Sequence, residues 1–251
     1  MGIAFLGAFG AAIGSFVNVV AYRLPRHQSL VKPRSRCPHC ERQIAGYDNI
    51  PVVSWILLRA RCRHCQAPIP VRYPLVEALT ALLFVGVGLK IGVEDTLLPA
   101  LALTITLVAA AETDLEHHII PNRLTATSAI AAVALWAVVD PGRLPENLIA
   151  GAAAGGFLLL AAVTYPAGMG MGDVKLAGVM GLYLGVSVAP ALFVGFAAGA
   201  AVGIALVVVR GASARKQGVP FGPFLALGGI VGLLYGPALI DWYGRISGLS
   251  G

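Results

Sequence analysis

The sequence predicts an all-α polytopic membrane protein with about eight transmembrane helices and a small cytoplasmic insert between the first and second helices. Hydrophobic residues make up 57% of the 251 residues and charged residues only 12%. That is more apolar surface than a soluble domain of this length can bury. The mean hydropathy is +0.81, and the polar residues are concentrated in one block, between Arg23 and Arg72.

Charge-poor segments recur along the chain, and crossing a bilayer takes about 20 apolar residues. Several segments are shorter than this, so we expect their ends to extend into the flanking polar residues. The first segment carries its arginines, Arg23 and Arg26, after the apolar run, which predicts an uncleaved helix rather than a secretory signal. The predicted spans cover residues 2–22, 73–89, 97–111, 124–139, 148–165, 174–188, 190–209 and 219–240.

The distribution of basic residues predicts the orientation in the membrane. Threading eight spans from an outside N-terminus places 15 of the 18 Lys and Arg residues on one side, and positive charge marks the cytoplasmic side. Asp114 and Asp173 then both lie at cytoplasmic helix ends. The net charge of +6 follows from this asymmetry, and it indicates contact with membrane lipid headgroups rather than with nucleic acid.

The polar block contains all four cysteines, in the segments Cys37-Pro-His-Cys40 and Cys62-Arg-His-Cys65. Two such pairs at this separation are typical of a tetrahedral zinc site with four thiolate ligands. Four sulfur ligands leave no open position for water, so the predicted Zn²⁺ is structural. Disulfides are the alternative, which a reducing cytoplasm disfavours.

These observations divide the chain into three parts: the first transmembrane helix (1–24), a cytoplasmic zinc-binding domain (25–72) and a seven-helix membrane domain (73–251). A block of about 50 residues is too small for a large hydrophobic core, so we expect the metal to supply much of its folding free energy. Its many prolines predict a loop-rich lobe with little helix, similar to a zinc ribbon.

Two aspartates lie where apolar segments meet the cytoplasmic side. Asp114 lies just after the third predicted span, and Asp173, in Gly170-Met-Gly172-Asp173, lies just before the sixth. Carboxylates at this depth are costly to keep charged and are usually retained for chemistry or transport. Gly170 and Gly172 let the backbone unwind and approach a ligand closely, which we interpret as an active-site loop beside a water-accessible pocket.

Two carboxyl groups held close together suit an aspartyl hydrolase, because both cannot ionise easily and one keeps a proton. The ionised aspartate can take a proton from water while the protonated one hydrogen-bonds the scissile carbonyl. Other interpretations stay open. Asp173 could cap its helix, Asp114 could pair with Arg123 or Lys175, and buried acids also serve ion- or proton-coupled transporters.

The ordered set of motifs resembles the bacterial type IV prepilin peptidases, a family of GxGD-type intramembrane aspartyl proteases that combines leader peptidase and N-methyltransferase activities. The resemblance runs nearly from end to end. It rests on Gly14-Ser-Phe-Val-Asn18 with the exit at Arg23-Leu-Pro25, Asn49-Ile-Pro51-Val-Val-Ser-Trp55, Arg72-Tyr-Pro-Leu-Val-Glu77, Asp114-Leu-Glu116, Gly170-Met-Gly172-Asp173 and Pro220-Phe-Gly-Pro-Phe224.

The resemblance implies that Asp114 and Asp173 are the catalytic pair. The substrates would be type IV prepilins and the pseudopilins of type II secretion. Their short basic leader stays in the cytoplasm while an apolar N-terminal helix sits in the membrane, and cleavage follows a glycine at that boundary. The protein would then reside in the bacterial inner membrane, with its zinc domain and active site facing the cytoplasm.

The resemblance also implies methylation of the new N-terminal amine with S-adenosylmethionine. A peptidase without methyltransferase activity is the alternative, because the residues themselves carry no signature of this cofactor. Glu41, Tyr47, Asp48 and Glu77 are chemically suitable for it, but isolated charges seldom mark a site, and each could instead be a solvated surface residue or part of a buried ion pair.

Overall fold

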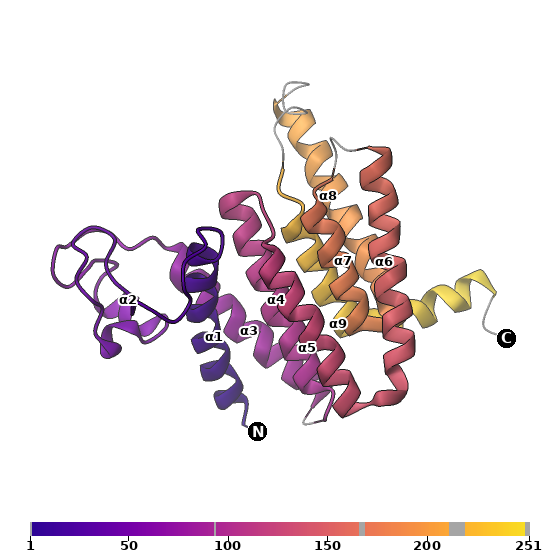
Figure 1. Ribbon diagram of the computed structural model, residues 1–251, viewed down its shortest axis with the longest axis horizontal. Coiled ribbons are helices and arrows are strands. Elements are labelled where there is room, and N and C mark those ends of the chain that lie inside the picture. Colours follow the sequence, from indigo (N-terminus) through magenta and orange to yellow (C-terminus); the bar gives the residue numbers. More distant parts are fainter. Residues whose placement is uncertain (1, 93, 166–168, 211–218, 249–251) are drawn as a thin grey trace. The chain divides into compact units, whose positions relative to one another are not determined.

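The computed structural model describes residues 2–92, 94–165, 169–210 and 219–248 (Figure 1). Within these ranges the regular secondary structure is helical, apart from two isolated β-bridges. The chain divides into two compact units, Met1–Leu97 and Leu98–Gly251. The helix that follows the cysteine lobe belongs to the same unit as the first helix. The predicted division had instead assigned this helix to the later membrane helices.

Seven stretches of the described residues are long and apolar enough to cross a membrane, so the chain is a multi-pass membrane protein. They are Ile3–Arg23, Arg72–Ile91, Leu97–His117, Asn122–Val139, Pro141–Thr164, Met171–Arg210 and Gly222–Ser247. The difference from eight predicted spans arises in the sixth stretch, which is 40 residues long. It contains two helices, α7 (Met171–Leu184) and α8 (Val188–Arg210), which correspond to two separately predicted spans.

A short 3₁₀ turn, η3 (Gly185–Ser187), separates α7 from α8. Gly185 begins this turn with φ of +56°, a left-handed conformation that costs glycine less than any other residue. Both helices pack on α9 (Gly222–Ser247). The glycine turn therefore lets one long apolar stretch form two packed helices.

The first unit is built on α1 (Ile3–Arg23) and α3 (Arg72–Ile91), which pack against each other. Gly10 and Gly14 lie one turn apart on α1. A Cβ atom at these positions would lie 2.9 Å and 2.7 Å from backbone atoms of α3. Small residues at this spacing let membrane helices approach closely, and van der Waals contact then replaces the hydrophobic effect as the source of stability.

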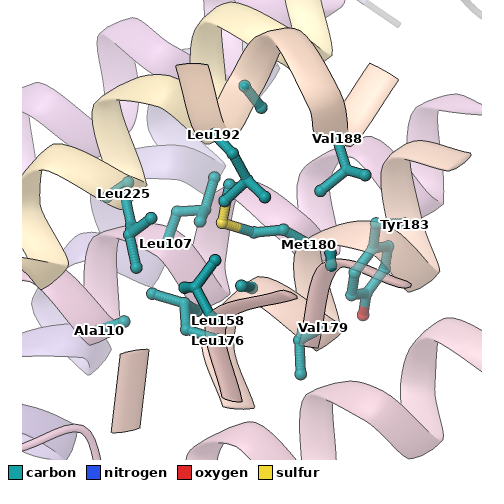
Figure 2. Close-up of a cluster of buried hydrophobic side chains, with 14 of the residues drawn as sticks. Leu107, Ala110, Leu158, Leu176, Val179, Met180, Tyr183, Val188, Leu192 and Leu225 are labelled. Atoms are coloured by element: carbon teal, nitrogen blue, oxygen red, sulfur yellow. The ribbon is translucent and has the colours of Figure 1, made fainter. Parts of the chain in front are cut away.

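The second unit contains α4 (Leu97–His117), α5 (Asn122–Val139), α6 (Leu144–Thr164) and the three helices α7 to α9. Its core draws large apolar side chains from five of these helices (Figure 2). The labelled residues include Leu107 of α4, Leu158 of α6, Leu176 and Met180 of α7, Leu192 of α8 and Leu225 of α9.

Buried polar side chains link three helices of this unit. The hydroxyl groups of Thr106 in α4 and Ser128 in α5 lie 2.6 Å apart, and the Tyr183 hydroxyl in α7 donates to the Ser128 carbonyl oxygen over 3.1 Å. Hydrogen bonds between membrane helices contribute about 0.6–2 kcal/mol each. They fix α4, α5 and α7 in register, and this register positions the helix ends described below.

The closest helix contact of α7 is with α6, and it depends on Gly181. A Cβ atom there would lie 2.6 Å from the Ala150 carbonyl oxygen, so Gly181→Ala is expected to lower the free energy of unfolding by about 1–3 kcal/mol. Melting temperatures in detergent micelles measure this loss. Gly156→Ala is the matched control, because a Cβ atom at Gly156 would meet nothing within 4 Å. Equal melting temperatures for the two variants would contradict the contact.

Candidate active site and metal centre

Three helix ends of the second unit bring the two predicted acids to one place. Asp114 lies in the last turn of α4, and Asp173 lies in the first turn of α7. The carboxyl groups of Asp114 and Asp173 are close enough to interact electrostatically. The first residue of α9, Gly222, joins them, because its backbone N–H donates to Asp114 Oδ2 over 2.7 Å.

Both acids are largely withdrawn from solvent, with exposures of 6% for Asp114 and 8% for Asp173. The N–H of Gly170 donates to Asp173 Oδ2 over 3.2 Å, and the positive end of the α7 dipole lies at the same point. Asp173 therefore caps its helix, which was one of the alternatives to a catalytic role. The same hydrogen bond orients the carboxyl group toward the site.

The alternative to a catalytic role for Asp114 was an ion pair with Arg123 or Lys175. Lys175 instead donates from Nζ to Asn122 Oδ1 over 2.7 Å. His118 is an electrostatic neighbour of Asp114, and it follows α4 with φ of +53°. The left-handed conformation of His118 ends the helix and turns the chain toward Ile120.

The two glycines of the GxGD segment have different environments. Gly170 precedes α7 in an extended conformation, with φ of −80° and ψ of 146°. Gly172 already lies inside the helix, and a Cβ atom there would lie 3.0 Å from Ile120 Cβ. The predicted unwinding is thus limited to Gly170, whereas Gly172 allows the segment after α4 to pack directly against α7.

Gly222 is a site residue to which the sequence analysis gave no role. A Cβ atom at this position would lie 2.8 Å from Asp114 Oδ2 and 3.0 Å from Asp114 Cβ. Only glycine therefore lets the backbone N–H approach this carboxylate. The signal was present in the sequence, because Gly222 is the central residue of the motif Pro220-Phe-Gly-Pro-Phe224.

The four cysteines of the first unit form a cluster, as their spacing predicts. Their sulfur atoms all lie within 4.8 Å of one another, and the Sγ atoms of Cys37 and Cys65 are 3.7 Å apart. A tetrahedral zinc ion with Zn–S bonds of about 2.3 Å requires sulfur atoms roughly 3.8 Å apart. All four are free thiols rather than disulfides, so the donor set fits a metal ion.

The two cysteine pairs are repeats of one structure. In the first, Cys37 donates its N–H to Arg42 and accepts at its carbonyl oxygen from Glu41, and in the second Cys62 makes the same bonds with Ala67 and Gln66. Glu41 and Gln66 both have positive φ, at 56° and 59°. The N–H groups of Cys65 and His64 also donate to the Cys62 sulfur and lower the pKa of this thiol, whereas burial and the neighbouring thiols raise the pKa of Cys65. Without a metal ion the four thiols therefore do not ionise equally.

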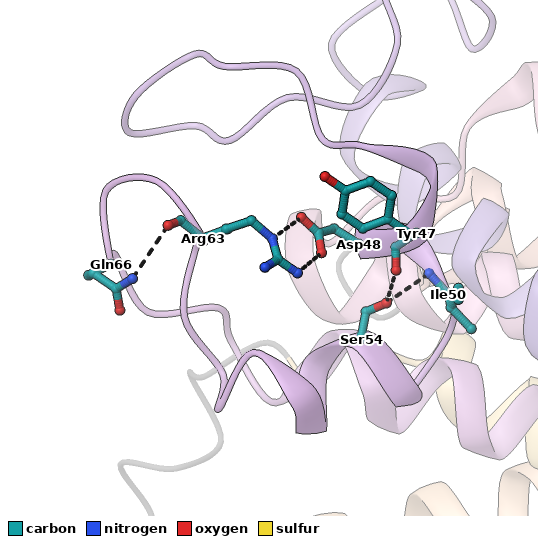
Figure 3. A network of polar contacts seen from close by, with 6 residues as sticks. All are labelled: Tyr47, Asp48, Ile50, Ser54, Arg63 and Gln66. Atoms are coloured by element: carbon teal, nitrogen blue, oxygen red, sulfur yellow. Dashed lines mark hydrogen bonds and ion pairs between the residues drawn. The ribbon is translucent and has the colours of Figure 1, made fainter.

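The lobe around the cluster has little helix, as its prolines predict: η1 (Gly46–Asn49) and α2 (Val53–Leu57) are its helical segments. Asp48 accepts two bonds from Arg63, of 2.8 Å and 2.6 Å, which join η1 to the second cysteine pair (Figure 3). The Arg63 guanidinium holds the pKa of Asp48 below its usual value. Asp48 is therefore engaged in an ion pair.

Ser54 closes the other side of this network. Its hydroxyl donates to the Tyr47 carbonyl oxygen over 2.9 Å and accepts from the Ile50 N–H over 3.0 Å (Figure 3). The Tyr47 side chain itself is exposed. The network thus fixes the backbone of the segment between the cysteine pairs and leaves the Tyr47 ring accessible.

Glu77 joins the lobe to the helix pair. Its Oε2 accepts from the Val52 N–H over 2.7 Å, and the Ser15 hydroxyl of α1 also bonds to it. One turn before it on α3, the Tyr73 carbonyl oxygen accepts from Asn18 Nδ2 over 3.2 Å. Glu77 is only 8% exposed, so it is a buried structural acceptor rather than a solvated surface charge.

Comparisons with known proteins cover both units of the chain. Residues 8–91 match the family model described as the bacterial peptidase A24 N-terminal domain, and residues 101–208 match the type IV leader peptidase family. The first range contains the cysteine cluster and the second contains both aspartates. No solved structure matches the chain.

Similar proteins are named prepilin leader peptidase/N-methyltransferase. The one from Aeromonas hydrophila is 38% identical over 94% of this chain and 91% of its own length. The one from Bacillus subtilis is 36% identical over 96% of this chain and 97% of its own length. A third, from Myxococcus xanthus, is 43% identical over 72% of this chain and 55% of its own length. With such identity along nearly its whole length, the chain belongs to the type IV leader peptidase family.

Proposed function

We propose that this membrane protein removes the leader peptide from type IV prepilins and then methylates the new N-terminal amine. The meeting of Asp114 and Asp173 at one end of the second unit carries this proposal. Membership of the family and the shared name of its relatives support it. The reaction is hydrolysis of one peptide bond, with no covalent intermediate, followed by methyl transfer.

Hydrolysis follows from two carboxyl groups that share one proton. The ionised aspartate takes a proton from a water molecule placed between the two, and the protonated aspartate hydrogen-bonds the scissile carbonyl oxygen. The roles exchange when the peptide C–N bond breaks and the leaving amine takes a proton. The N–H groups of Gly170 and Gly222, which bond Asp173 and Asp114, hold the carboxyl groups in position during this exchange.

The distribution of charge supports a location in the bacterial inner membrane, with the aspartates and the cysteine lobe at the cytoplasmic face. Of the 18 basic residues, 15 fall on that side when the chain is threaded from an outside N-terminus. The basic leaders of prepilins and pseudopilins would then be cut where their apolar helix enters the bilayer. Anionic lipid headgroups are the remaining partner of this basic face.

The four-cysteine cluster holds a structural Zn²⁺ in this proposal, because the sulfur geometry and the four-thiolate donor set match that ion. S-adenosylmethionine supplies the methyl group for the second reaction. Of the four side chains suitable for this cofactor, Asp48 and Glu77 already accept hydrogen bonds from Arg63 and Val52. Glu41 and Tyr47 are exposed and accessible to a ligand.

One experiment tests both activities. Purified protein in liposomes is incubated with a prepilin and S-adenosylmethionine carrying a labelled methyl group. Loss of the leader together with label on the shortened pilin supports the full proposal. Leader loss without label indicates a peptidase alone. Absence of both reactions would contradict the proposal and leave the transporter interpretation, which an ion-flux assay on the same liposomes tests directly.

Asp114→Asn and Asp173→Asn are each expected to slow leader removal by at least roughly 100-fold, because each removes one partner in proton transfer. The rate of leader loss in liposomes measures this effect. Asp140→Asn is the matched control, since Asp140 lies at the far end of α5 and contacts Gly142 and Arg143. Wild-type rates in either active-site variant would refute the two-acid mechanism.

Gly222→Ala is expected to slow leader removal by roughly 100-fold, because misplacing a catalytic group by about 1 Å has this effect. The added methyl group would displace the Asp114 carboxyl group, which leaves no room for it. Gly203→Ala is the control, since a Cβ atom there meets nothing within 4 Å. A wild-type rate of leader removal in the Gly222→Ala variant would show that the Gly222 contact does not matter for the reaction.

Elemental analysis of the purified protein should find one zinc ion per chain, and Cys37→Ser combined with Cys62→Ser should release it. We expect the lobe to become sensitive to protease and methyl transfer to be impaired at least as much as leader removal. His39→Ala is the control, because His39 lies inside the first cysteine pair but does not belong to the cluster of four sulfur atoms. Zinc-free protein with a protease-resistant lobe would contradict the metal site.

A further inference from the structure

The segment between the two cysteine pairs exposes large apolar side chains, and the reaction described above makes no use of them. Residues 50–58 are all uncharged and contain α2, and we call them the α2 segment. Ser54 of α2 points into the polar network of the lobe (Figure 3), and the Trp55 indole N–H donates to a backbone carbonyl oxygen of the lobe over 3.0 Å. The other α2 side chains share one face, because they follow the i, i+3, i+4 spacing. The exposed apolar residues of the segment, at 48% to 75%, are Ile50, Val53, Ile56 and Leu57.

Two hydrogen bonds fix the depth of the α2 segment along the helix pair. Val52 donates its N–H to Glu77 of α3, and Glu77 also bonds the Ser15 hydroxyl of α1. Glu77 lies five residues inside α3, and Ser15 lies eight residues inside α1. These positions are about 8 Å and 12 Å from the helix ends that join the lobe. The segment is therefore attached beside the helices rather than beyond their ends.

This depth corresponds to a position in the bilayer, because neither helix has residues to spare. The helices α1 and α3 contain 21 and 20 residues, so each is about 30 Å long, which is the thickness of the hydrocarbon core. The turns that hold Val52 also expose the large apolar side chains Phe16, Leu75 and Leu79, as expected of a surface in contact with lipid. The α2 segment thus lies at the boundary between headgroups and acyl chains.

The backbone of the α2 segment suits a place with little water, where a backbone N–H without an acceptor is costly. The Ile50 N–H donates to the Ser54 hydroxyl and the Val52 N–H to Glu77. Pro51 has no N–H to satisfy. Acceptors within the same unit also serve the N–H groups of residues 53, 54, 56 and 58–60. These groups do not depend on water for their hydrogen bonds.

The charge around the segment favours lipid over other occupants. Arg59 and Arg61 follow α2 directly and are exposed, and residues 23–72 contain ten basic and only two acidic residues. Anionic headgroups complement this charge, whereas the basic leader of a prepilin would be repelled by it. A helix with one apolar face, a tryptophan and neighbouring arginines is typical of segments that lie in the membrane interface.

We infer that the α2 segment is an interfacial anchor that binds the lobe to anionic phospholipid. Val53, Ile56 and Leu57 insert among the acyl chains of the leaflet on the side of the lobe. Arg59 and Arg61 lie at the headgroups of the same leaflet. The lobe is then held to the membrane at three places, by the end of α1, the start of α3 and the α2 segment between them. Part of the predicted cytoplasmic domain is thus embedded in lipid.

Photocrosslinking tests this inference and requires neither prepilin nor activity. A photoreactive amino acid with a small diazirine side chain replaces Leu57 in one protein and Val31 in another. Val31 is the matched control, because it is also an exposed apolar residue of the lobe but lies in the loop that Arg23 holds at the end of α1. Each full-length protein is irradiated in phosphatidylethanolamine and phosphatidylglycerol liposomes. We expect phospholipid adducts at Leu57 and their loss, in favour of reaction with water, at Val31.

Ile56 lies on the same face of α2 and is also exposed, so it serves as a second probe position and the test does not depend on one variant. Phospholipid adducts at Ile56 are expected as well. Adducts with residues 98–251 or with a second copy of the chain, in place of lipid, would assign this face to a protein contact and overturn the inference. Equal lipid labelling at Leu57 and Val31 would also overturn it, because the α2 segment would then be no deeper than the rest of the lobe.

Discussion

The hydrogen bond from the Gly222 N–H to Asp114 is the interaction on which the site depends. It joins the end of α4 to the start of α9, two segments distant in sequence, at the point where α7 also begins. A buried carboxylate without donors is costly in an apolar environment. The backbone N–H groups of Gly170 and Gly222 supply such donors without adding a competing charge. The helix ends are thus arranged by the same contacts that orient the reactive groups.

The sequence predicted the features that depend on local pattern. Hydropathy located the helices, and the two CxxC pairs predicted a cluster whose sulfur atoms do lie together. Charge asymmetry placed Asp114 and Asp173 at one membrane face, and the structure brings these residues to one end of the second unit. Each of these predictions uses periodicity, spacing or composition, which short stretches of sequence carry on their own.

Contacts between distant backbone segments could not be predicted in the same way. Gly222 acts through its N–H group, which every residue except proline has, so its role depends on the packing of α9 against α4. The ion pair of Asp48 with Arg63 was one among many possible pairings with nearby basic residues. Gly172 was assigned to an unwound loop because glycine favours irregular backbone, whereas its missing side chain serves contact with Ile120.

The two cysteine pairs share one pattern of backbone hydrogen bonds. Each pair is a small half of the metal site, with its turn closed by a left-handed residue after the second cysteine. Hydrogen bonds within each turn restrict the backbone locally, so each pair orders its two cysteines together rather than one at a time.

Val52 has φ of +61°, a conformation that a β-branched residue rarely adopts and that costs about 1–3 kcal/mol. Its N–H reaches Glu77 only because the chain is turned in this way. The strain in the Val52 backbone therefore offsets part of the free energy that its hydrogen bond with Glu77 contributes. The net stabilisation from this contact between the lobe and α3 is correspondingly small.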